Sequence, residues 1–468
     1  MLALLPLLTL LACPPADDGK PTRPVLDDTG TTDTDTTDTA TDPLVETDVF
    51  ADAEIGVHPA VRTMLNVRWS QRADAEVWLS WDFEGVPRES PRRALGRGTQ
   101  FEVVLGLPAD TEVDVWLHAQ VGDEVVARDL GPISTGPLPD VLITPTLNLR
   151  DAAGMRPEPW LLTSVNVGST NFYGPCFVVI VDDQARIVWY AGVTDSRLTM
   201  FPKVSRWGGY LTWDATSYYA FGTTPSVTRS TLDLKQREEV VVAGMGLTYD
   251  ELEDGAFLFD ENEDGYRYHL TRQDPDGTRT RLWECYPWME TWNTGYWGCA
   301  ANTVLWDDTR QTVLWSMFQT STVVEIDPDT GEIVREFGQY PGGYAFDPET
   351  SMFALQHYPN WTGDGTLIVS THVPDQPGVQ MAREFEVDDS TNTLREVWSY
   401  TPEAGYYADY AGQVQKLPSG NVLWQFGTAG IVQEVTPAGE VVWEMSYQDR
   451  LLGNVTPIAD LYALNAGW

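Results

Sequence analysis

One strand pattern recurs six times in the C-terminal two thirds of this chain. Each copy has an alternating apolar strand, a turn rich in Asp and Gly, and a second apolar strand that often carries a late Trp. The copies are residues 178–190, 230–242, 268–284, 323–337, 384–400 and 432–445. A period of about fifty residues, built only from strands and turns, is typical of a β-propeller. The pattern therefore predicts an all-β fold with six blades of four strands, closed radially around a channel.

The ends of the repeat region predict how this ring closes. Before the first hairpin only one strand is available, residues 159–166 (PWLLTSVN). The missing innermost strand must then come from elsewhere in the chain. We expect residues 457–465 (PIADLYALN) to pair into the first blade and close the ring.

The N-terminus is typical of a targeting segment rather than of a folded element. Residues 1–13 are an apolar run that ends in Leu-Leu-Ala-Cys and resembles a bacterial lipobox, although no Lys or Arg precedes Cys13. Lipidation of Cys13 would place the protein in the bacterial cell envelope, periplasmic or on the outer surface, with the lipid as its only membrane contact. An ordinary cleaved secretory signal is the alternative. Residues 14–51 are a Thr/Asp-rich tether that we expect to be disordered.

Residues 52–137 form a separate unit in the sequence. Val67 and Trp69, like Leu79 and Trp81, alternate with polar residues at a period of two, which indicates half-buried antiparallel strands. Residues 105–137 resemble the end of a fibronectin type III or related Ig-like β-sandwich, although Val113 stands where such domains often carry a tyrosine. This domain should space or orient the propeller predicted for residues 138–468. Its histidines, His58 and His118, are interpreted as structural.

The charge and the cysteines restrict the possible partners and bonds. The net charge of −40 makes the surface repel phosphate backbones, which argues against nucleic acid as a partner. An extracytoplasmic location permits a disulfide, and Cys285 and Cys299 are the natural pair. Cys176 then remains as a buried free thiol, unless it is reactive.

One acidic motif raises the question of a metal. Asp260, Asn262 and Asp264 match the first half of an EF-hand-type calcium loop, D-x-N-x-D-G. The twelfth position would be Thr271 rather than Glu, and strands flank the motif. We interpret it as an acidic β-turn, with calcium as the alternative, and expect no other cofactor.

Polar residues recur at one point of the repeat, where the chain enters the innermost strand of a blade. Aligned on the turns that follow, these residues are Thr199, Tyr249, Asn302, His357 and Gln413. In a propeller such positions face the axis at one end of the channel. Converging polar groups in a concave site predict a binding site there. His357 is the single histidine of the set.

Three of the repeat segments carry a family resemblance. QHYPNWTGDGTLIVSTH, AANTVLWDDTRQTVLWSMFQTSTVVEIDPDTGEIVREFG and GQVQKLPSGNVLWQFGTAGIVQEVTPAGEVVWEM are similar to the bacterial arylsulfate sulfotransferases, over roughly residues 155–465. The resemblance implies a β-sandwich followed by a six-bladed propeller. It also implies transfer of a sulfuryl group from an aryl sulfate to a phenol, without a nucleotide cofactor, through a channel histidine. His357, which follows Gln356, matches that nucleophile, and Asn302 matches an asparagine that holds the sulfate oxygens.

This chain departs from the family pattern at three positions. Ala300 stands where the family has a histidine, Tyr249 where a histidine-rich strand entry is expected, and Phe318 where an arginine is expected. Losing a single charge-stabilising donor typically lowers the rate about 10²- to 10³-fold. Possible replacements elsewhere in the chain are Arg206, Arg383 and His372.

Two classes of function therefore follow from the sequence. The first is an arylsulfotransferase-like envelope lipoprotein with reduced activity, in which His357 is the nucleophile and Asn302, Tyr249 and Gln413 bind a small aryl sulfate or phenol. The second is a non-catalytic propeller that binds a ligand or acts as a scaffold at the cell surface. Turnover of an aryl sulfate separates them.

Overall fold

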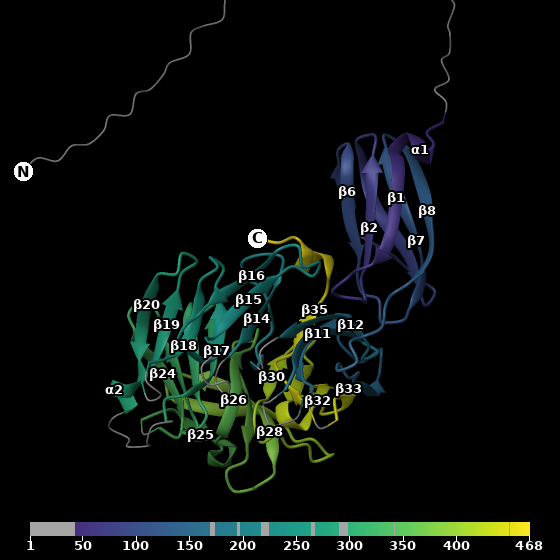
Figure 1. The fold of residues 1–468 in the computed structure, drawn as a ribbon. Coiled ribbons are helices and arrows are strands. Elements are labelled where there is room, and N and C mark those ends of the chain that lie inside the picture. The colour runs from purple at the N-terminus through teal and green to yellow at the C-terminus, as the bar shows by residue number, and fades with distance from the viewer. Residues whose placement is uncertain are drawn as a thin grey trace, which may run out of the picture. The chain divides into compact units, whose positions relative to one another are not determined.

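In the computed structural model of the protein, strands account for nearly all regular structure. The structure describes residues 43–168, 174–193, 197–216, 224–263, 267–289, 298–340, 342–448 and 450–468. The α-helices in these ranges are the short α1 (Glu46–Val49) and α2 (Cys285–Met289) (Figure 1). Among the described residues, no helix has the length and apolar composition that a membrane span requires. Residues 1–42, with Cys13 and most of the expected tether, lie outside the described ranges. The expected tether was drawn too long at its C-terminal end, because residues 46–51 lie in α1 and β1, and Val49 and Phe50 are fully buried in the core of the N-terminal part.

Two antiparallel sheets enclose the core of the N-terminal part. The alternating residues Val67, Leu79 and Val115 are fully buried between them, as the period of two predicted. The first sheet has the order β1 (Phe50–Val57), β2 (Leu65–Gln71), β6 (Gly98–Val104). The second has the order β4 (Val86–Glu89), β3 (Ala75–Phe83), β7 (Glu112–Val121), β8 (Glu124–Ser134), with β5 (Arg93–Leu95) also on β3.

The two histidines of this part make local contacts. His58 Nδ1 accepts the backbone N–H of Val61 at 3.0 Å. His118 Nε2 lies 2.7 Å from Ser80 Oγ, and its ring stacks on Trp78. These contacts agree with a structural role for both.

The repeat region of the described chain forms six antiparallel sheets in sequence order, a β-propeller-like arrangement. The last two strands of each sheet correspond to the six expected hairpins (Figure 1). The sheets are β10 (Trp160–Asn166), β11 (Cys176–Asp182), β12 (Ile187–Val193); β13 (Lys203–Val204), β14 (Leu211–Ala215), β15 (Ser226–Ser230), β16 (Arg237–Val241); β17 (Met245–Glu251), β18 (Phe257–Asn262), β19 (Tyr268–Gln273), β20 (Arg279–Glu284); β21 (Ala301–Asp307), β22 (Thr312–Met317), β23 (Thr322–Ile326), β24 (Ile333–Gly338); β26 (Ala354–Trp361), β27 (Leu367–His372), β28 (Gln380–Asp388), β29 (Thr393–Tyr400); and β30 (Gln413–Lys416), β31 (Val422–Phe426), β32 (Ile431–Val435), β33 (Val441–Ser446).

The second hairpin starts earlier than the sequence predicted. Its first strand is β15, which ends at the residue where the expected range 230–242 begins. Residues 231–236 of that range form the turn instead. The side chain of Asp233 explains this, because it accepts the hydroxyl of Thr231 at 2.7 Å and the backbone N–H of Lys235 at 3.0 Å. Such local side-chain hydrogen bonds compete with strand pairing.

The C-terminal segment pairs with the first sheet, but through earlier residues than expected. β34 (Leu451–Leu452) and β35 (Thr456–Ile458) both pair antiparallel with β10. Residues beyond Ile458 do not extend this strand, since Asp460 accepts the N–H of Tyr462 at 2.8 Å and a 3-10 helix follows at Tyr462–Asn465. First and last parts of the repeat region are thereby hydrogen-bonded together.

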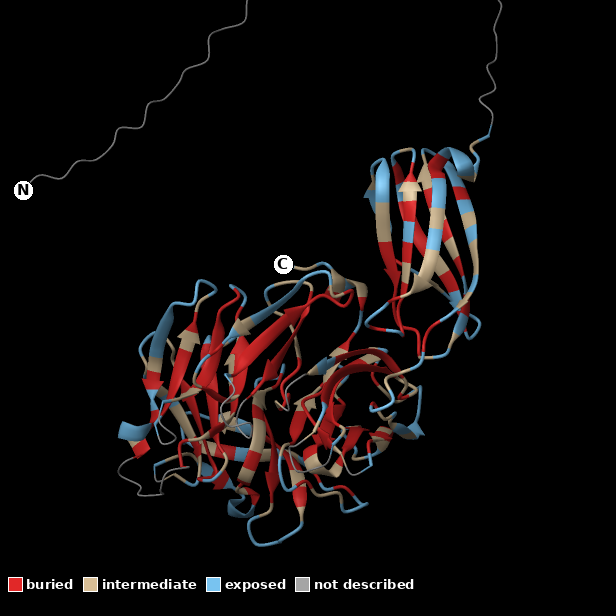
Figure 2. Ribbon diagram, in the orientation of Figure 1, coloured by how far each residue is buried: buried red, intermediate tan, exposed pale blue. Residues whose placement is uncertain are grey.

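Two further strands were not foreseen, because they are short and lie outside the repeated hairpins. β9 (Thr146–Arg150) pairs with β33, and β25 (Ala345–Asp347) runs parallel to β29. The second strand is buried along its whole length in β11, β14, β22, β27 and β31, whereas outer strands such as β16 and β20 carry exposed residues (Figure 2). Cys285 and Cys299 form a disulfide, and Cys176 is a buried free thiol.

Candidate functional site

A cavity of about 460 Å³ lies where the innermost strands and their preceding loops meet. Its wall is mainly apolar, and the lining residues within the described ranges include no Lys, Arg, Asp or Glu. The cavity is lined by Leu198, Met200, Phe201, Leu247, Ala300, Ala301, Asn302, Thr303, Phe318, Gln319, His357, Tyr358, Tyr410, Ala411, Gly412 and Asn454. Two of the expected site residues, His357 and Asn302, thus lie in one cavity.

His357 reaches the cavity from an irregular strand. β26 has two breaks in its pairing with β27, one on each side of His357. Leu355 and Tyr358 have φ angles of 47° and 49°, a left-handed backbone that bulky residues rarely adopt. Bulges of this kind redirect side chains beside functional sites.

Both ring nitrogens of His357 are hydrogen-bonded to backbone. Nδ1 lies 3.2 Å from the carbonyl oxygen of Leu355, which can only accept, so Nδ1 carries the proton. Nε2 therefore holds the lone pair, and it accepts the N–H of Ala411 at 3.2 Å. Burial, with a smaller contribution from His372, lowers the pKa of His357 to about 3, so the imidazole is neutral at pH 7.

Asn302 and Phe318 complete the immediate surroundings of the imidazole. Asn302 Nδ2 donates to the carbonyl of Gln356, the neighbour of His357, at 2.6 Å. Gln356 itself points away from the cavity and binds Ser316 Oγ at 3.0 Å. The ring of Phe318 meets the imidazole edge-to-face with 5.2 Å between centroids. Where the family pattern has an arginine, this chain presents an apolar ring to His357.

Tyr249, Gln413 and Thr199 lie outside the cavity wall, contrary to the alignment of strand entries. Tyr249 is fully buried and its hydroxyl donates to Phe201 O at 3.0 Å. The reason is a register shift in β17 between Met245 and Tyr249, which presents Leu247 to the cavity instead. Gln413, in β30, accepts the N–H of Val455 at 2.5 Å, and Val455 lies in the C-terminal segment between β34 and β35.

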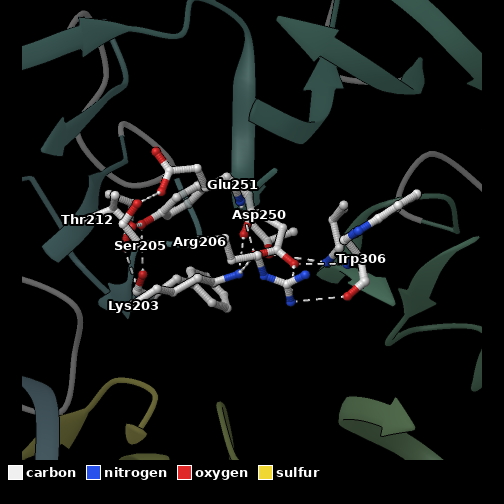
Figure 3. Close-up of polar contacts among 12 residues, drawn as sticks. Lys203, Ser205, Arg206, Thr212, Asp250, Glu251 and Trp306 are labelled. Atoms are coloured by element: carbon white, nitrogen blue, oxygen red, sulfur yellow. Dashed lines mark hydrogen bonds and ion pairs between the residues drawn. The ribbon is translucent and has the colours of Figure 1, made fainter. Parts of the chain in front are cut away.

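Arg206, the first possible replacement cation, belongs to an ion-pair network (Figure 3) and is not among the residues that line the cavity. It pairs with Asp308 at 2.8 Å and lies 3.6 Å from Asp250. Asp250 also pairs with the buried Lys203 at 2.7 Å and accepts the N–H of Trp306 at 2.9 Å. These charges neutralise one another between three successive sheets.

The other two possible replacements are also engaged elsewhere. Arg383 pairs with Glu396 at 2.5 Å. His372 Nε2 donates to the carbonyl of Ala408 at 3.0 Å, and burial lowers the pKa of His372. Neither side chain lines the cavity.

The acidic motif does not present its first residue to solvent. Asp260 is 1% exposed and accepts the N–H groups of Leu247 and Thr248, so its carboxylate is not available to calcium. Asn262 Nδ2 donates to the hydroxyl of Tyr268 at 3.1 Å, and Asp264 lies outside the described residues. No group of three potential metal ligands occurs in the described ranges.

Sequence reasoning missed the loop and C-terminal residues of the cavity. Tyr410, Ala411 and Gly412 precede an inner strand, and Asn454 comes from the closing segment. The only available signal was their position next to a repeat, because Ala411 and Gly412 carry no functional group, and Tyr410 and Asn454 stand in no recognisable motif.

Comparison with protein families gives one match. Residues 297–453 match the family model described as Arylsulfotransferase (ASST). This range contains the polar lining residues of the cavity other than Asn454, namely Asn302, Thr303, Gln319, His357, Tyr358 and Tyr410. No curated protein sequence matches the chain.

Solved structures resemble the chain at low identity. TolB from Acinetobacter baumannii is 10% identical, with 75% of this chain and 80% of that chain covered and a TM-score of 0.45. A protein of unknown function from Bacteroides caccae is 14% identical, with 65% and 100% covered and a TM-score of 0.44. Virginiamycin B lyase from Staphylococcus aureus is 13% identical, with 53% and 69% covered and a TM-score of 0.33. Identities this low carry no information about the ligand.

Proposed function

Because this chain is an arylsulfotransferase family member over residues 297–453, we propose that its cavity binds an uncharged phenol or related aromatic compound beside His357. The family match supports an arylsulfotransferase-like function. The observation that carries the finer proposal is the composition of the cavity wall. Its described residues combine Met, Leu, Phe and Tyr side chains with a few neutral polar groups and no cation.

The wall favours a neutral ligand over an anionic one for an electrostatic reason. A sulfate ester moved from water into an apolar cavity loses its hydration, and that loss is large unless charged or hydrogen-bonding partners replace the water. Here Phe318 occupies the position beside His357, and His357 is neutral and already accepts the N–H of Ala411. A phenol carries no charge and needs only one or two hydrogen bonds. Its ring can pack against Phe318 and Tyr410.

Binding measurements with a matched ligand pair test this proposal. We expect isothermal titration calorimetry at pH 7 to show that 2-naphthol binds at least about tenfold more tightly than 2-naphthyl sulfate. Phe318→Arg places a cation beside His357 and should narrow or reverse this preference, whereas Phe318→Leu, which keeps the wall apolar, should retain it. Tighter binding of the sulfate by the wild type would refute the proposal.

Sulfuryl transfer through His357 is the second candidate, favoured by the neutral imidazole at the cavity wall. The Nε2 lone pair would attack sulfur as the S–O bond to the aryl group breaks, and the phenolate would leave. A phenol oxygen would then attack sulfur, the S–N bond would break, and the phenol proton would pass to solvent. Negative charge on the transferred group would lack a cation among the described residues of the wall, so we expect transfer to be slow or absent.

Turnover of 2-naphthyl sulfate with phenol as acceptor separates the two candidates. We expect wild type and His357→Ala to release naphthol at the same background rate. Rapid release by the wild type, loss of release in His357→Ala, and a sulfuryl group mapped to His357 would establish the transferase instead.

The finer description of the architecture is also a proposal. We infer that the six sheets of residues 138–468 are the blades of a closed six-bladed propeller, and that residues 52–137 form an Ig or fibronectin III-like sandwich. Pairing of β34 and β35 with β10 supports closure. An experimental structure with another number of blades or an open ring would contradict it.

We further propose that Cys13 is lipidated and that the residues from 14 up to α1 tether the folded part to the cell envelope. The support is the apolar run that ends in Leu-Leu-Ala-Cys. Cys13→Ser should move the protein from the membrane fraction to the soluble fraction, because a lipid chain is then absent. Continued membrane association of Cys13→Ser would contradict the anchor.

A further inference from the structure

The segment 406–412, the last part of the connection from β29 to β30, contacts His357 through Ala411. It contributes Tyr410, Ala411 and Gly412 to the cavity wall. We propose that this segment is a latch that blocks the chemistry of His357 by covering its only free lone pair with the N–H of Ala411. The latch would regulate the cavity described above, and its biological meaning rests on the proposed function. The experiment that tests the latch measures only the reactivity of His357 and does not depend on that function.

The hydrogen bonds of His357 define what the latch blocks. A neutral imidazole has one N–H and one lone pair. The N–H is at Nδ1, since its partner is the carbonyl of Leu355, and the lone pair is therefore at Nε2. Ala411 N–H points at Nε2 with 3.2 Å between the nitrogens. In this state His357 can neither attack an electrophile nor accept a hydrogen bond from a ligand.

The first half of the latch is firmly anchored. The carbonyl of Ala408 accepts Nε2–H of His372 at 3.0 Å, and its N–H donates to Gln380 Oε1 at 2.9 Å. All three residues are buried, and the hydroxyl of Tyr407 lies 3.3 Å from His372 Nδ1. Two strands, β27 and β28, thus hold the chain at Ala408 and make this residue a natural hinge.

The second half of the latch contains its strained residue. Tyr410 is 50% exposed and is held by Thr428, whose N–H donates to the Tyr410 carbonyl at 3.2 Å and whose Oγ1 lies 3.5 Å from the Tyr410 N–H. Ala411 has a φ of 60°, a left-handed conformation that is unfavourable for any residue with a Cβ. The closed latch also depends on Gly427, because a Cβ there would come within 2.3 Å of the carbonyl oxygen of Tyr410. Opening would relieve the strain at Ala411 and expose Nε2.

The strain at Ala411 provides a graded test that leaves the chemical groups of the cavity in place. Ala411→Gly removes the penalty of a Cβ at positive φ and should favour the closed latch. Ala411→Val puts a β-branched residue at positive φ, which is more strained than Ala, and should favour the open latch. The reactivity of His357 should then rise in the order Gly, Ala, Val.

Diethyl pyrocarbonate measures this reactivity, because it acylates an imidazole nitrogen that has an accessible lone pair. The rate at His357 is followed by peptide mass mapping at pH 7, with His118 in the N-terminal part as an internal control. We expect His357 of the wild type to react at least about tenfold more slowly than in the urea-unfolded chain. We expect Ala411→Gly to be slower than wild type by about fivefold and Ala411→Val faster by at least that factor. Reaction at His118 should stay constant.

The outcomes separate the latch from the proposed function. Equal rates for the three residues at position 411, or a wild-type rate equal to that of the unfolded chain, would overturn the latch. If Ala411→Val does not fold, the comparison of wild type with Ala411→Gly still decides. Calorimetry with 2-naphthol on the same proteins tests the ligand separately, so a graded reactivity without naphthol binding would retain the latch and refute the proposed function.

Discussion

Replacement of Asp260 by Asn should change how the stability of the protein depends on pH. The carboxyl group of Asp260 is 1% exposed, and its neighbours are the backbone N–H groups of Leu247 and Thr248 at 3.0 and 2.8 Å. Burial raises the pKa of Asp260 from 3.8 to about 8, while the amides act in the opposite direction. The group is thus protonated at neutral pH in the folded protein and ionised in the unfolded chain.

The sign and size of the effect follow from proton linkage. Because the folded pKa is raised, the stabilisation is complete below pH 3.8 and is lost as the pH rises through about 8. Within this window unfolding releases one proton from Asp260, and the free energy of unfolding falls by about 1.4 kcal/mol per pH unit. Between pH 5.5 and 7.5 this amounts to roughly 2.7 kcal/mol. Asn does not titrate, so Asp260→Asn should lack this component.

Urea unfolding, followed by tryptophan fluorescence at several pH values between about 5.5 and 7.5, measures how the free energy of unfolding of wild type and of Asp260→Asn depends on pH. Asp375→Asn, on an exposed turn, makes the same chemical replacement of a carboxyl group by an amide and serves as the control. Other groups, including Asp214 with a pKa raised to about 6 by burial, titrate equally in all three proteins. A hydrogen bond weakened by Asn would shift the stability at every pH without changing its slope. Parallel pH profiles for wild type and Asp260→Asn would refute the reasoning.

Three further changes test other parts of the fold. Ile458→Ala in β35 removes a 4% exposed side chain from the closing strand and should lower the free energy of unfolding by about 2–5 kcal/mol; a loss below about 0.5 kcal/mol in urea unfolding would contradict a role in closure. Glu434→Ala leaves Arg156, its fully buried partner at 3.0 Å, without a counter-charge and should cost about 3–5 kcal/mol, whereas wild-type-like thermal stability would contradict this. Replacement of both Cys285 and Cys299 by Ser opens a short loop and should cost about 3 kcal/mol by the same measurement, with an unchanged midpoint as the contrary result.

The sequence determined those features that depend on local pattern. Alternation of apolar residues and Asp/Gly turns placed the six hairpins, because the side chains of a strand alternate between its two faces. His357 and Asn302 line one cavity, whereas Tyr249, Gln413 and Thr199, at the same point of the repeat, do not. The repeat thus indicates where the inner strands begin, but not which of their side chains face the cavity.

The tertiary structure alone decided which side chains face the cavity and what they can do there. A register shift in β17 places Tyr249 in the core and Leu247 at the cavity. Four positions of β17, from Met245 to Tyr249, lie opposite two positions of β18, and such an irregularity leaves no mark in an alternating pattern. The N–H of Ala411 on His357 joins residues 54 positions apart through a backbone conformation that the residue type disfavours. A backbone group carries no sequence signature, so the state of the histidine lone pair follows only from how distant segments pack together.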